Sequence, residues 1–141
     1  MGFNKKQLEA HRKRLQALQS PMVVKEIESA LFDGGQVIEA YAKHLITVGS
    51  VSGKGHVPSK PGEPPNYDTG VLTGNIETTK AGVLTVHVSS KAPYAGYLEF
   101  GTSRMAERPY MLPSRNAKEK EVAALVTEAV NFAVRKSKRT A

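Results

Sequence analysis

The sequence contains no cysteine among its 141 residues. A disulfide framework, a thiolate metal site and a cysteine nucleophile are therefore excluded, and the fold must be stable without covalent cross-links. The sequence also lacks an apolar run of the roughly 18 to 20 residues that cross a bilayer, and no apolar stretch of a signal peptide follows its basic N-terminus. We therefore expect a protein that is made in the cytoplasm and works without membrane contact.

Patterns typical of catalysis or metal binding are also scarce. The four histidines lie in different segments, and none has another histidine, aspartate or glutamate at metal-ligand spacing. Residues 49–55 approach a phosphate-binding loop, but they have three residues between two glycines where the motif needs four. Glu99 and Glu107 form a candidate carboxylate pair, although pairing with Arg104 or Arg108, or capping a helix, is the more ordinary role. We expect no enzyme activity, cofactor or metal.

Positive charge is concentrated at the two ends of the chain. Residues 1–19 and 135–141 together hold nine basic residues and one acidic residue, whereas the 115 residues between them hold 11 basic and 12 acidic residues. Such ends either form a solvated surface or contact polyanions, since a cation beside a phosphate releases condensed counterions. The candidates for contact with DNA or a protein partner are Lys5, Lys6, Arg12, Lys13, Arg14, Arg135, Lys136, Lys138 and Arg139.

Hydrophobic periodicity predicts three helices. A thin apolar stripe in a basic segment predicts a short helix within residues 1–19, and Ser20-Pro21 predicts the capped start of the next one. Apolar residues at three- and four-residue steps continue over about 22–48 and again over about 114–135. Gly34-Gly35 lies in the middle of the long helix, where it predicts a bend or a close crossing by another element.

An antiparallel hairpin is predicted over residues 76–90, with its turn at Ala81-Gly82. In its second strand Leu84, Val86 and Val88 alternate with polar residues, so we expect them to face the core. The expected fold is a single α+β domain, residues 1–141, in which this small antiparallel sheet packs against the long helix and the C-terminal helix.

The segment after the hairpin is expected to be buried beneath it. Residues 93–100 are apolar enough for a short buried helix that places Tyr97, Leu98 and Phe100 in the core. A subunit interface is the alternative for a minority of its aromatic residues, since interfaces favour tyrosine and phenylalanine anchors. Gly101 would end this helix in a left-handed conformation. Pro109 and Pro113 would then hold a second loop over residues 102–113.

Residues 49–67 hold four glycines and four prolines without a hydrophobic period, which predicts one long loop. Loops of this length in a compact domain are usually functional or disordered until bound. Prolines lower the entropy lost on ordering and glycines allow close approach, so a contact with a neighbouring subunit is the favoured role, and an untethered surface loop is the alternative. The candidate interface residues are Lys54, His56, Lys60, Pro61, Glu63, Pro64 and Pro65.

Two segments carry a family resemblance in their order and spacing. Pro61-Gly-Glu-Pro-Pro65 precedes Thr69-Gly70-Val-Leu72, and a later segment, Ala92–Thr102, precedes Arg108-Pro109. Over roughly residues 20–135 the chain resembles the gene-product-ten-like family of neck, or tail-completion, proteins of long-tailed bacteriophages. The residues that match the pattern are Thr69, Gly70, Leu72, Tyr94, Leu98, Glu99, Phe100, Gly101, Thr102, Arg108 and Pro109.

The resemblance implies a structural virion protein at the head–tail interface, assembled in the host cytoplasm and acting without a substrate. Its partners would be further copies of itself in a hexameric or dodecameric ring, and neighbouring stopper or adaptor and tail-tube or terminator proteins. The charge of the basic ends adds a separate inference: because double-stranded DNA passes through the neck, these ends would either touch it without base reading or contact a neighbouring protein ring. A tail terminator is one alternative. A small basic, non-specific DNA-binding protein is another, although the sheet lacks the interleaved aromatic and basic residues that stack bases.

Overall fold

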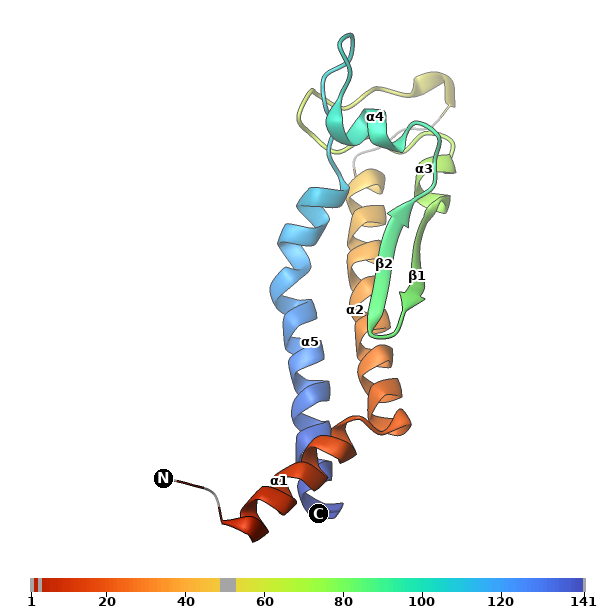
Figure 1. Cartoon of the computed structure of the whole chain (residues 1–141). Helices are drawn as coiled ribbons and strands as arrows, with labels where there is room; N and C mark the ends of the chain where they lie inside the picture. The colour runs from red at the N-terminus through yellow and green to blue at the C-terminus, as the bar shows by residue number, and fades with distance from the viewer. Residues whose placement is uncertain (1, 3, 49–52, 141) are drawn as a thin grey trace.

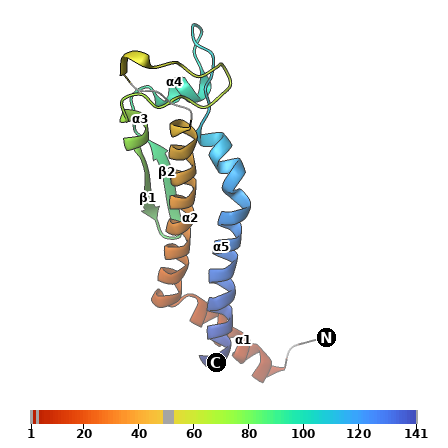
Figure 2. The same cartoon turned by 180° about the vertical axis from the view of Figure 1, so that it is seen from behind.

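The computed structural model of the protein describes residues 2, 4–48 and 53–140. Two long antiparallel helices form a shaft, a β-hairpin lies along it, and short helices and loops form a cap at one end (Figure 1). Both chain ends lie at the opposite end, which we call the base (Figure 2). In chain order the elements are α1 (Lys5–Leu18), α2 (Pro21–Thr47), a 3-10 turn (Gly53–Gly55), α3 (Val71–Gly74), β1 (Ile76–Gly82), β2 (Thr85–Ser90), α4 (Ala95–Phe100) and α5 (Met111–Thr140).

The predicted α+β fold is confirmed, and its long helix begins as expected. The Ser20 hydroxyl accepts a hydrogen bond from the backbone N–H of Val23 at 3.4 Å, and Pro21 occupies the first helical position, where a missing N–H removes no bond. The helix then continues without interruption through Gly34-Gly35.

The two central glycines of α2 allow close approach from two elements. A Cβ atom at Gly34 would lie 2.8 Å from Cγ1 of Val122 in α5, and one at Gly35 would lie 2.6 Å from Cγ2 of Thr78 in the hairpin. Contacts this short are incompatible with a larger residue unless a neighbour moves. Of the two predicted explanations, the close crossing is therefore the one observed.

Helix α5 begins earlier and ends later than predicted. It starts at Met111 rather than 114, so Pro113 belongs to its first turn instead of closing the preceding loop. The first N–H groups of a helix have no partner within it, and proline is tolerated there for that reason. The helix continues beyond the predicted end at 135 to Thr140, and its last turn is basic, which suits the helix dipole.

The hairpin turn lies two residues further along the chain than predicted. β1 continues to Gly82, and a register shift between Lys80 and Gly82 marks a bulge. The turn therefore falls on Val83 and Leu84, and Leu84 has a φ of 52° and is 44% exposed. The expectation that Leu84 faces the core is wrong, whereas Val86 and Val88 are half-buried and approach α2 at Gly35.

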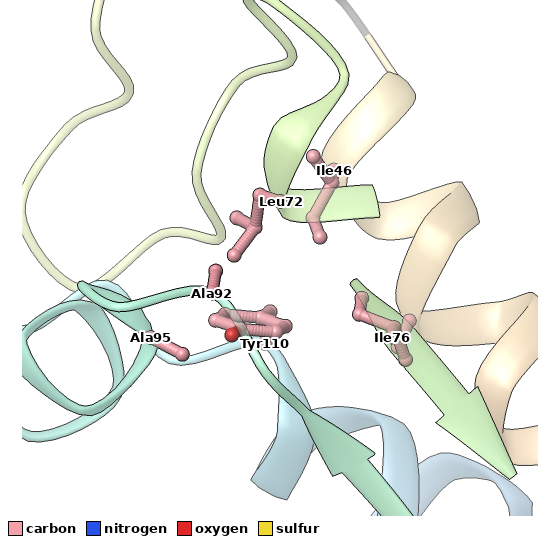
Figure 3. Packing of buried hydrophobic residues seen from close by; sticks show 7 residues of the cluster. Ile46, Leu72, Ile76, Ala92, Ala95 and Tyr110 are labelled. Carbon is pink, nitrogen blue, oxygen red and sulfur yellow. The ribbon is translucent and has the colours of Figure 1, made fainter. Parts of the chain in front are cut away.

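The largest buried cluster lies where the cap meets the shaft (Figure 3). Its largest fully buried side chains are Tyr110, which has no exposed surface, and Ile46 and Ile76, each 1% exposed. The chain exposes 9782 Å² in total, whereas a compact monomer of this mass exposes about 7,100 Å². The molecule is therefore long and thin, with much surface for its size. The cluster is composed of Ala42, Ile46, Leu72, Ile76, Ala92, Ala95 and Tyr110.

Candidate functional site

The cap, residues 53–75 and 91–110, contains most of the residues that sequence analysis singled out. Its central contact is made by Glu99 in α4. One oxygen of this carboxylate accepts the backbone N–H groups of Tyr110 and Met111, each at 3.0 Å, and the other accepts that of Leu112 at 2.9 Å. Glu99 thus accepts the three backbone donors at the start of α5, where the next residue, Pro113, has no N–H, and it places a negative charge at the positive end of the helix. Of the roles considered for Glu99, helix capping is the one observed.

The residues after Glu99 bring the chain back to it. Gly101 has a φ of 72°, and a Cβ atom there would lie 2.9 Å from both the Glu107 nitrogen and the Met105 oxygen. The N–H of Thr102 donates to the carbonyl of Met105 at 2.8 Å, which closes a tight loop. The N–H of Arg108 then donates to the carbonyl of Leu98 at 2.6 Å. Glycine is required at 101 because a side chain would collide with backbone atoms.

The proline-rich loop is fastened to this second loop. The Arg108 guanidinium donates through Nε to the carbonyl of Ser59 at 3.3 Å, and the N–H of Gly62 donates to the carbonyl of Glu107 at 2.9 Å. Pro65 is buried and belongs to the packing of the cap, while Pro64 and His56 are half-buried. The exposed members of the predicted interface set are Lys54, Lys60, Pro61 and Glu63.

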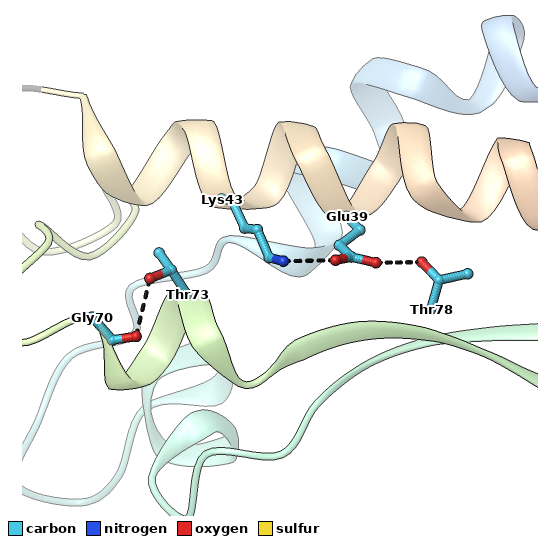
Figure 4. Close-up of polar contacts among 5 residues, drawn as sticks. All are labelled: Glu39, Lys43, Gly70, Thr73 and Thr78. Carbon is cyan, nitrogen blue, oxygen red and sulfur yellow. Dashed lines mark hydrogen bonds and ion pairs between the residues drawn. The ribbon is translucent and has the colours of Figure 1, made fainter.

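The Thr69-Gly70-Val-Leu72 segment forms the turn that leads into α3. Gly70 has a φ of 83°, and a Cβ atom there would lie 2.7 Å from the Tyr67 hydroxyl. The Thr73 hydroxyl donates to the carbonyl of Gly70 at 3.1 Å (Figure 4). Leu72 is consequently held in the buried cluster, and Thr69 is exposed.

A hollow of about 240 Å³ lies between the proline-rich loop, α3 and α4. It brings together six of the residues that match the family pattern, from both halves of the motif. A cavity of about 150 Å³ is known to hold a benzene molecule, so this hollow is large enough for an aromatic side chain. The six pattern residues in its lining are Thr69, Gly70, Leu72, Tyr94, Leu98 and Arg108.

Three aromatic residues of α4 and its N-cap form an exposed surface, here called the aromatic patch. Tyr94 is 40%, Tyr97 60% and Phe100 81% exposed. The prediction that Tyr97 and Phe100 lie in the core is wrong, and only Leu98 packs against the buried cluster. The reason is that α4 is a short helix on the cap surface, so its other face is left to solvent. Exposed aromatic groups of this size are typical of interfaces.

The nine predicted contact cations lie at the base, far from the cap (Figure 1). α1 packs across α5, so both basic ends of the sequence meet there. Lys136 donates to Glu26 at 3.3 Å and lies 5.7 Å from the centre of the Phe132 ring. In the described residues no helix is long and apolar enough to cross a membrane.

Residues 9–101 match the family model of the bacteriophage HK97 gp10 tail component. The chain belongs to this family. The matched stretch includes most of α1 and ends at Gly101, whereas the motifs indicated about 20–135, so Arg108-Pro109 and α5 lie outside it. Neither the comparison with curated proteins nor that with solved structures found a match. The protein is therefore a structural component of a bacteriophage tail and of the virion.

Proposed function

We propose that this tail component is a subunit of a hexameric or dodecameric ring at the head–tail interface, where it completes the tail and joins it to the head. The observation that carries the proposal is the aromatic patch. Phe100 is 81% exposed on a chain that already has much surface for its mass. A typical stable interface buries about 800 Å² on each partner, so two neighbours in a ring would cover much of that excess.

A closed ring requires heterologous contacts, in which one surface of a subunit meets a different surface of the next. The cap offers such a pair: Phe100 at the end of the aromatic patch, and the hollow of about 240 Å³, whose lining includes Tyr94 but not Phe100. In the proposed ring, Phe100 of one subunit enters the hollow of its neighbour. Aromatic anchors seated in pockets are the usual centres of binding energy in protein interfaces.

The neighbouring rings would be a stopper or adaptor on one side and a tail-tube or terminator protein on the other. The exposed loop residues Lys54, Lys60, Pro61 and Glu63 lie on the cap and are our candidates for contact with one of them. A tail terminator, which caps the tube, remains the second candidate because it uses a ring of similar subunits. The two functions differ in whether tail length is controlled when the protein is missing.

Disruption of the gene in its phage, followed by electron microscopy of the lysate, tests the function. Full heads beside separate tails of normal length are expected for a joining protein. Tails of uncontrolled length would assign the terminator function, and intact infectious virions would overturn both.

Complementation of the disrupted phage tests the contact. Phe100→Ser is expected to lower the plating efficiency at least tenfold, while the purified variant unfolds at the same urea concentration as the wild type. Val83→Ser is the matched control, because Val83 is 77% exposed but lies in the hairpin turn. Full complementation by Phe100→Ser, or an equal loss with Val83→Ser, would contradict the proposed contact.

A further inference from the structure

The fold brings the two basic ends of the sequence to the base, where α1 packs on α5, and the exposed cations of these two helices are here called the basic face. α1 lies across the C-terminal part of α5, and no described residue of α1 is buried. Lys136 is paired with Glu26, and no ion pair is found among the described residues for the other eight cations. These eight, which make up the basic face, are Lys5, Lys6, Arg12, Lys13, Arg14, Arg135, Lys138 and Arg139, all exposed.

Local helix stability does not account for the charges of α1. The helix is capped by Asn4, whose side chain accepts from the Gln7 N–H at 2.8 Å, and its first turn holds no acidic residue. Lys5 and Lys6 instead occupy the first turn, where a positive charge opposes the helix dipole. These two lysines therefore lower the stability of the isolated helix, and helix stability gives no reason for their presence.

The spacing of the charges suits a dense polyanion. α1 has 14 residues and is about 21 Å long, and Glu9 is its only acidic residue. Duplex DNA carries one negative charge per about 1.7 Å of its axis, so about twelve phosphate charges face such a length. Lysine is depleted in the cores of protein–protein interfaces, whereas lysine and arginine are the principal phosphate ligands.

We infer that the basic face binds the phosphate backbone of duplex DNA without reading its sequence. The face lies at the opposite end of the molecule from the cap, so the inference is independent of the proposed ring contact. Contacts from α1 and from the end of α5 are both needed, because α1 supplies five of the eight cations and α5 the other three.

Fluorescence anisotropy of a labelled 30-base-pair duplex, titrated with the full-length protein at several salt concentrations, tests the inference. Each test variant and the control removes three positive charges, so net charge is matched. The variants are K5Q/K6Q/K13Q in α1, R135Q/K138Q/R139Q in α5 and, as the control in the cap, K54Q/K60Q/R104Q. Circular dichroism and urea unfolding verify that each variant is folded.

The logarithm of the wild-type association constant is expected to fall steeply and linearly with the logarithm of the salt concentration. Each phosphate contact contributes about 0.9 to that slope, so either test variant should reduce it by about 2.7, and the cap control should leave it unchanged. Two duplexes of unrelated sequence should bind equally. Binding that is absent at low salt, an equal loss in the cap control, or tighter binding of polyglutamate than of DNA would each overturn the inference, the last in favour of an acidic protein partner.

Discussion

The carboxylate of Glu99 accepts the backbone N–H of Tyr110 at 3.0 Å, and this contact joins α4 to the start of α5. The ten residues between Glu99 and Tyr110 form the loop that Gly101 and Arg108 close. The Leu-Glu-Phe-Gly-Thr segment, residues 98–102, therefore ends α4 and caps the start of α5. It also explains the position of Phe100: with Leu98 and Glu99 turned toward the protein, the next side chain points outward.

Replacing Glu99 should destabilise the protein, because three backbone donors of α5 lose their acceptor. For Glu99→Ala we expect a loss of about 1–3 kcal/mol in the free energy of unfolding, and a smaller loss for Glu99→Gln, which keeps one carbonyl oxygen. Urea denaturation at pH 7 measures both. Glu107→Ala is the control, since Glu107 is exposed and contributes only backbone atoms to the loop. Equal effects at 99 and 107 would contradict the capping role.

The helices of the shaft were predictable because their signals are local. Ser20-Pro21 specifies the start of α2 by capping, and three- and four-residue spacing specifies its apolar face. The sequence also predicted a close crossing at Gly34-Gly35 as one of two explanations. It did not show which elements cross there, since Val122 is 88 residues from Gly34 in the chain and Thr78 is 43 residues from Gly35.

The candidate site was less predictable because exposure depends on tertiary structure. Tyr97 and Phe100 are of residue types that are common in cores, and apolarity alone does not separate a core residue from an interface residue. The hairpin turn was misplaced because the bulge after Lys80 shifts the register, and Ala81-Gly82 is the stronger local turn signal. That α1 and the end of α5 lie at the same end of the molecule follows from the antiparallel shaft, which no local pattern encodes.

The glycines of α2 should not tolerate alanine, although alanine is the better helix former. Alanine gains about 1 kcal/mol in helix propensity, but the added methyl at Gly34 would lie 2.8 Å from the stiff Val122 side chain. Overpacking costs about 1–3 kcal/mol, so we expect Gly34→Ala to lower the free energy of unfolding by up to about 2 kcal/mol in urea denaturation.

Two further variants isolate the steric cause. Gly96 lies in α4 with nothing within 4 Å of an added Cβ, so Gly96→Ala should be neutral or stabilising by up to about 1 kcal/mol. In a double-mutant cycle, Val122→Ala should partly rescue Gly34→Ala, because the two substitutions act on one contact. Additive effects in that cycle would show that the close crossing does not limit position 34.

Acid should weaken the attachment of the hairpin to α2 through Glu39 (Figure 4). Burial by itself raises the pKa of Glu39, but hydrogen bonds from Lys43 at 2.6 Å and Thr78 at 2.7 Å outweigh it, so the pKa is lowered from 4.5. Because the folded value lies below the unfolded one, the stabilisation is complete above about pH 4.5 and is lost as the pH falls through the folded value.

The measurement is urea unfolding between pH 3 and pH 7. Glu39→Gln should show a smaller loss of stability in acid than the wild type does. Thr78→Val removes one donor but keeps the shape of the side chain, so its acid loss should lie between those of the wild type and Glu39→Gln. A Glu39→Gln profile parallel to the wild type would exclude this carboxylate as the cause.

Alkaline pH should destabilise the protein through Tyr110, which has no exposed surface and donates a hydrogen bond from its hydroxyl to the Ser90 hydroxyl at 2.8 Å. Burial raises the pKa of Tyr110 above 10.0; the hydrogen bond with Ser90 opposes the shift, and the negative charge of Glu99 adds to it. The folded value exceeds the unfolded one, so the stabilisation is complete below about pH 10 and is lost as the pH rises through the folded value.

The measurement is urea unfolding from pH 7 to pH 11. Tyr110→Phe should be less stable than the wild type at pH 7 by about 1 kcal/mol but should lose less stability at high pH. Ser90→Ala should be weakened at pH 7 yet keep the alkaline loss, because Tyr110 still titrates; an alkaline loss as large in Tyr110→Phe as in the wild type would assign it to other groups.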